Sequence, residues 1–126
     1  MIHLKKYKKF LLESALTDTY WAKEIGDETI KVTLSDVIDY LDNKDIIEID
    51  PKKLEKLLIE VDRDPKRVDK ADLDYPVILA ESGGEITHIL DGQHRIVKAI
   101  KNDLDKIKAR ILNIDESPEE FKKVFN

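Results

Sequence analysis

One short segment, residues 91–95, contains residue types that can bind phosphate and lies where a predicted strand meets a predicted helix. Residues 91–95 read Asp-Gly-Gln-His-Arg. A strand-like apolar run ends there, and residues 96–104 carry apolar side chains at helical spacing. The first turn of a helix has N–H groups without intrahelical partners and a partial positive charge, so it attracts anions. Our hypothesis is that this turn binds phosphate, in particular the phosphate of a nucleotide.

Each residue of the turn has an expected role. Gly92 lets the backbone approach a ligand closely, and Gly92, Gln93 and His94 offer backbone N–H groups. Arg95 has a planar donor fork suited to phosphate, and His94 has a donor whose charge changes near neutral pH. Lys98 follows one helical turn after His94 and can face the same ligand. The structural alternative is that Asp-Gly is an ordinary turn dipeptide before a helix.

Carboxylates near the turn are candidates for catalysis. We expect Asp91 to cap the helix, with Mg²⁺ held between Asp91 and the phosphates as the alternative. A phosphotransferase or hydrolase also needs a general base, and Asp72 and Asp91 are the two candidates. The three histidines are scattered along the chain, so no histidine-based metal site is predicted.

Composition limits the classes of function. A chain of 126 residues is predicted to form one domain, and the absence of cysteine excludes disulfides and thiolate chemistry. The lysine-rich start lacks a long apolar run, so we expect no membrane partner and a cytoplasmic protein. The net charge of −5 predicts weak or no binding of nucleic acid, although residues 94–110 are locally basic, Arg110 included.

The order of predicted elements indicates an α+β fold with a small mixed sheet and flanking helices. We expect residues 1–45 to be a helical extension packed on a core domain of residues 46–126. The predicted elements are a helix over 3–16, a strand over 30–33, a helix capped by Ser35, a strand over 46–49, a helix from Asp50-Pro51, strands over 77–80 and 86–90, a helix after Gly92, a strand over 107–114 and a last helix capped by Ser117.

The later part of the chain resembles the ParB/sulfiredoxin-like superfamily. The residues that carry the resemblance are Tyr75-Pro76-Val77-Ile78-Leu79, Ile89 to Arg95, Lys98-Ala99 and Ile107 to Leu112. In that family a proline-led strand precedes a hairpin that ends in a Gly-x-[His/Arg]-Arg turn, and a helix then leads to a closing strand. The resemblance covers about residues 46–114, and residues 67–76 are similar to small bacteriophage-encoded members.

This resemblance implies nucleotide binding at the turn, with ATP or CTP as the ligand and Mg²⁺ as a companion ion. It also implies a phosphotransferase or NTPase activity, with the host cytoplasm as the location of a phage-encoded member. Sulfiredoxins carry their redox cysteine where this chain has Gln93, so that chemistry is excluded. Two alternatives remain open: a ParB-like nuclease or DNA-modification protein, and a non-catalytic phage protein that binds a host factor.

Overall fold

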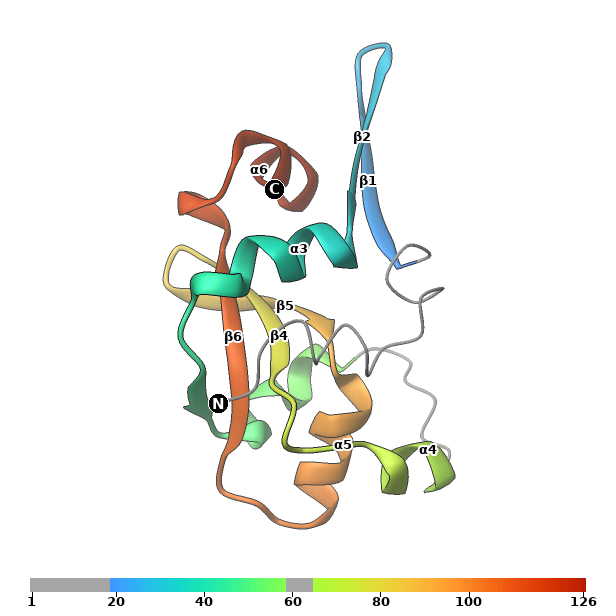
Figure 1. Cartoon of the computed structure of the whole chain (residues 1–126), viewed down its shortest axis with the longest axis vertical. Coiled ribbons are helices and arrows are strands. Elements are labelled where there is room, and N and C mark those ends of the chain that lie inside the picture. The colour runs from blue at the N-terminus through green and yellow to red at the C-terminus, as the bar shows by residue number, and fades with distance from the viewer. Residues whose placement is uncertain (1–18, 59–64) are drawn as a thin grey trace.

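A four-stranded mixed sheet organises the part of the chain that the computed structural model describes, residues 19–58 and 65–126 (Figure 1). The sheet order is β3 (Ile47–Ile49), β6 (Ile107–Asn113), β4 (Val77–Ser82) and β5 (Glu85–Asp91). Strand β4 is parallel to β6 and antiparallel to β5, and β3 is antiparallel to β6. The predicted α+β class and mixed sheet are confirmed, whereas the helix expected over residues 3–16 lies outside the described residues.

The central strand β4 is buried on both faces, which explains its uninterrupted apolar run. Its first four side chains, Val77 to Ala80, are all at most 1% exposed. Ile78 and Ala80 belong to one apolar cluster, and Val77 and Leu79 to the other. A strand covered on both sides reads as a continuous apolar segment because neither face needs polar residues.

Helices cover the two faces of the sheet. One face carries α5 (Gln93–Lys101) and the 3₁₀ helix η2 (Pro51–Leu57), and Leu54, Ile96 and Ala99 are buried there. Helix α4 (Pro65–Lys70) packs against α5. The other face carries α3 (Leu34–Tyr40), the 3₁₀ helices η1 (Leu41–Asn43) and η3 (Ile114–Glu116), and α6 (Glu119–Phe125). Within the described residues, no helix is both long enough and apolar enough to cross a bilayer.

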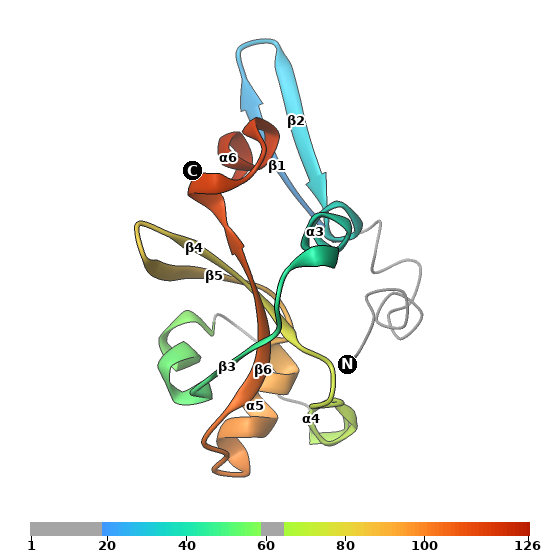
Figure 2. The same ribbon diagram turned by 60° about the vertical axis from the view of Figure 1, so that its left-hand side comes forward.

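A β-hairpin projects from the main body, and its first strand was not predicted from the sequence. Strands β1 (Tyr20–Ile25) and β2 (Glu28–Thr33) pair only with each other and extend away from the four-stranded sheet (Figures 1 and 2). Helix α6 packs on the base of the hairpin, where the rings of Trp21 and Phe125 lie 5.4 Å apart. The strand predicted over residues 30–33 therefore lies within β2, whereas β1 is a strand in a region that we expected to be a helical extension.

Helix boundaries show which local predictions were wrong. The N-cap of α3 is Thr33 rather than Ser35: Thr33 Oγ1 accepts from the amide of Asp36 at 3.1 Å. The Asp36 carboxylate in turn accepts from the amide of Thr33 at 2.9 Å, which completes a capping box. Ser117 does not cap α6, because its hydroxyl donates to the carbonyl of Ile114 at 2.7 Å.

The predicted helix after Asp50 does begin there, since the Asp50 carboxylate accepts from the amide of Lys52 at 2.9 Å. The segment Pro51–Leu57 is a 3₁₀ helix, however, and not an α-helix. The cap-and-proline pattern predicted where the helix starts, but such local signals do not distinguish the two hydrogen-bonding patterns.

Replacing Thr33 tests the observed cap. Thr33→Ala removes the side-chain acceptor at the start of α3, so the free energy of unfolding should fall by about 0.5–2 kcal/mol. Ser35→Ala is the matched control and should change it by less than about 0.5 kcal/mol, as is usual away from special sites. Urea denaturation measures both, and a larger loss in Ser35→Ala would contradict the assignment.

Candidate functional site

The junction between β5 and α5 lies where the sequence predicted it. Strand β5 ends at Asp91, helix α5 begins at Gln93, and Gly92 is the N-cap between them with φ of 104°. A Cβ atom on Gly92 would lie 2.7 Å from Cγ1 of Val77, which is too close. Only glycine satisfies both the left-handed backbone and the close approach to β4.

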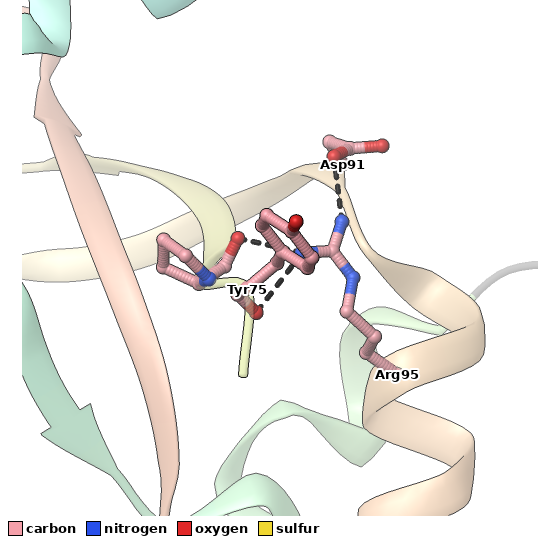
Figure 3. Close-up of polar contacts among 4 residues, drawn as sticks. Tyr75, Asp91 and Arg95 are labelled. Atoms are coloured by element: carbon pink, nitrogen blue, oxygen red, sulfur yellow. Dashed lines mark hydrogen bonds and ion pairs between the residues drawn. The ribbon is translucent and has the colours of Figure 1, made fainter. Parts of the chain in front are cut away.

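The guanidinium of Arg95 is directed inward and joins three segments (Figure 3). Its Nη1 donates to the carbonyls of Tyr75 at 3.1 Å and Pro76 at 2.7 Å, and its Nη2 donates to the Asp91 carboxylate at 2.7 Å. The residue is only 5% exposed. Arg95 therefore holds the start of α5 against the entrance of β4, so the donors that we had assigned to phosphate face the protein interior.

Lys98 also has a structural role in this geometry. Its ammonium donates to the carbonyls of Asp69 and Ala71, each at 2.8 Å. These carbonyls lie at the end of α4, where a cation is favourable because helix carbonyls lack partners there. Lys98 thus connects α5 to α4, and its ammonium donates to these carbonyls rather than toward the helix start.

Two buried polar atoms at the start of α5 make no hydrogen bond within the described part of the chain. Gln93 Oε1 and His94 Nε2 are shielded from solvent, and neither has a hydrogen-bond partner in the part of the chain that the structure describes. The first intrahelical bond runs from the amide of Ile96 to the carbonyl of Gly92, so the amides of Gln93 and His94 precede it. A buried polar group without a partner costs about 1–3 kcal/mol.

Asp91 does not cap the helix through its side chain, contrary to expectation. Its carboxylate pairs with Arg95, and no side-chain hydrogen bond is made at the helix N-cap. Burial raises the pKa of Asp91 above its ordinary value of 3.8, although the charge and hydrogen bond of Arg95 oppose the shift. One carboxylate oxygen contacts Arg95 and the other points away from it (Figure 3).

Asp72, the second candidate base, is part of a turn before β4. Its Oδ1 accepts from the amide of Asp74 at 2.9 Å, an Asx turn that orders the chain just ahead of Tyr75. In this structure Asp72 shapes the approach to β4, whereas Asp91 belongs to the junction itself.

The residues described do not form a cage for Mg²⁺. No group of three or more histidine, aspartate or glutamate side chains is placed to hold a metal ion within residues 19–58 and 65–126. Asp91 alone would supply a carboxylate, so the ion would depend on phosphate oxygens and water.

Arg110 is a buried residue whose place the sequence did not predict. Its position in a basic stretch of the sequence suggests a place near the turn, but it pairs in register with Ile78 and lies on the α3 face of the sheet. Its guanidinium donates to the carbonyls of Leu41 and Lys44, so it fixes the end of η1 to β6. Charge runs in the sequence do not show which sheet face a residue occupies.

Comparisons with known proteins provide no assignment. No protein family, curated protein sequence or solved structure matches this chain.

Gly92→Ala tests whether close approach to β4 requires glycine. The matched control is Gly84→Ala, because Gly84 also has positive φ but its Cβ would meet nothing within 4 Å. The control should lose about 1–2 kcal/mol from backbone strain, and Gly92→Ala at least about 1 kcal/mol more from the contact with Val77. Equal losses in denaturant titration would show that the contact is relieved without cost.

The Asp91–Arg95 pair predicts an order of carboxyl pKa values. The pKa of Asp91 should lie above 3.8 in the native protein, higher in Arg95→Lys and highest in Arg95→Met, which removes both the charge and the hydrogen bonds. NMR titration of the Asp91 side chain measures all three proteins. A pKa in Arg95→Met at or below the native one would contradict the pairing.

The same shift sets a pH dependence of stability. The raised pKa means that the folded state holds the Asp91 proton more tightly than the unfolded chain does. The contribution of Asp91 is therefore most favourable below pH 3.8 and declines as pH rises through the folded-state pKa. In Asp91→Asn the free energy of unfolding should fall less over this pH range than in the native protein, and urea denaturation at a series of pH values measures the difference.

Proposed function

We propose that this protein binds the phosphate group of a nucleotide at the start of α5. The observation that supports it is the pair of solvent-shielded, unpartnered atoms on Gln93 and His94 beside backbone amides at the helix N-terminus. Oriented N–H groups and the helix dipole favour an anion at this position. The ParB/sulfiredoxin-like resemblance independently favours the same ligand.

Both side chains can act as donors to phosphate. Rotating the Gln93 amide by half a turn exchanges its oxygen for an NH₂ group, and His94 carries a proton on Nε2 in one tautomer. Arg95 and Lys98 then serve as the frame that orients the helix start, rather than as phosphate ligands. This division of roles replaces the one expected from the residue types alone.

For a phosphotransferase or NTPase, Asp91 is the better candidate base. A raised pKa makes its carboxylate a stronger proton acceptor, and its second oxygen points away from Arg95. Asp72 orders a turn instead. We therefore propose ligand binding as the primary function, with Asp91 as the residue that would carry any phosphoryl transfer from ATP or CTP.

Substitutions at the two unpartnered side chains test the binding site. Gln93→Met and His94→Phe keep bulk but remove the polar atoms, so the affinity for ATP or CTP should fall about tenfold, or about 1.4 kcal/mol. The free energy of unfolding should stay the same or rise, because a buried group without a partner is removed. Isothermal titration calorimetry and urea denaturation provide the two readouts.

Lys108→Ala is the control, because it changes an exposed side chain far from the proposed site: Lys108 lies on the side of β6 opposite to α5. It should bind as the native chain does. If the native protein binds neither nucleotide nor tripolyphosphate, the proposed function is wrong.

A further inference from the structure

A cavity beside the proposed phosphate site has no role in what has been described so far. It lies between η2, α4 and α5 and has a volume of about 310 Å³. Its walls are mainly apolar, and Glu55 and Lys101 are the two charged residues that line it. The residues that matter for its chemistry are Leu58, Val68, Val97, Ile100, Glu55 and Lys101.

The cavity and the helix start lie along one face of α5. Gln93, Val97 and Ile100 are spaced by four and three residues, which places them on the same side of the helix. At 1.5 Å per residue, Val97 lies about 6 Å and Ile100 about 10 Å further along the axis than Gln93. A ligand with an anionic end at Gln93 can therefore extend directly into the cavity.

The lining selects the kind of group that fits. Val68, Val97 and Ile100 present aliphatic surface suited to the face of a planar ring. The volume is at the small end of ligand pockets, which suits one ring system rather than a larger ligand. Glu55 and Lys101 also line the cavity, and their types provide an acceptor and a donor that suit the polar edge of such a ring.

Lys101 is able to take part because its present partner is weak. Its ammonium lies 3.5 Å from the Asp69 carboxylate, and both side chains are more than half exposed. Exposed pairs of this kind contribute little, so the donor can turn toward a ligand at low cost.

We infer that this cavity receives the base of the nucleotide, and that Glu55 selects bases with an exocyclic amino group, such as adenine or cytosine. This inference rests on the proposed function, because the phosphate bound at the start of α5 places the base. The Glu55 carboxylate accepts from the amino group. A base with a carbonyl at that position brings a second acceptor against the carboxylate and is disfavoured.

Matched ligands separate the base site from the phosphate site. Calorimetry with tripolyphosphate, ATP, ITP, CTP and UTP compares ligands that share the phosphates and differ at the base. The native protein should bind ATP more tightly than ITP, and CTP more tightly than UTP, each by about tenfold or more. Tripolyphosphate should bind more weakly than ATP.

Two variants locate the effect. Val97→Phe fills the cavity, so ATP should bind no more tightly than tripolyphosphate, whose own affinity stays unchanged. Glu55→Gln replaces one acceptor oxygen with an NH₂ donor and keeps the other as an acceptor, so the preferences for ATP over ITP and CTP over UTP should fall to about twofold or less. Glu48→Gln is the matched control, since Glu48 is an exposed glutamate on β3, and it should keep the native preferences.

The outcomes distinguish this inference from the proposed function. Equal affinities of the native protein for tripolyphosphate and all four nucleotides would overturn the base site while leaving phosphate binding in place. A native preference that Glu55→Gln does not change would overturn the role of Glu55. Binding of no ligand at all would overturn both proposals. If Val97→Phe does not fold, the Glu55→Gln comparison decides the matter.

Discussion

Arg95, in the first turn of α5, directs its guanidinium between the entrance of β4 and the end of β5, and it contacts both. A charge in such a place costs several kcal/mol unless it has a counter-charge and hydrogen bonds, and Asp91 with two carbonyls supplies them. Because this pair holds the helix start so close to β4, residue 92 has no room for a side chain. This contact fixes the start of α5, and the buried side chains of Ile96 and Ala99 hold the helix on the sheet.

That constraint also determines which groups remain for a ligand. The two most strongly cationic side chains near the turn, Arg95 and Lys98, donate to backbone carbonyls of other segments. Around the turn, among the residues that the structure describes, the buried side-chain polar atoms without partners belong to Gln93 and His94. A helix start that is held rigidly by one set of donors presents its amides in a fixed direction, and preorganised donors of this kind favour binding because little ordering remains to be done.

Local patterns predicted the segment from β4 to β6 well, and the reason can be seen in particular residues. The apolar run of Val77 to Ala80 reports a strand buried on both faces, and the glycine pair after Ser82 marks the turn of a hairpin. Strand β1 was missed because most of it projects into solvent, so its side chains carry no clear apolar alternation. The cap at Thr33 was missed because Ser35, two residues later, is an equally good cap by type.

The sequence by itself determined the order of strands and helices around the turn, the junction at Gly92 and the residues gathered there, because these depend on contacts between near neighbours in the chain. Only the tertiary structure decided what the basic side chains do. Arg95 contacts a carbonyl 20 residues away, Lys98 one 29 residues away and Arg110 one 69 residues away. Such partners are set by which strands pair and which helices cover each face. A basic residue that donates to a distant buried carbonyl has the same appearance in the sequence as one that faces solvent or a phosphate.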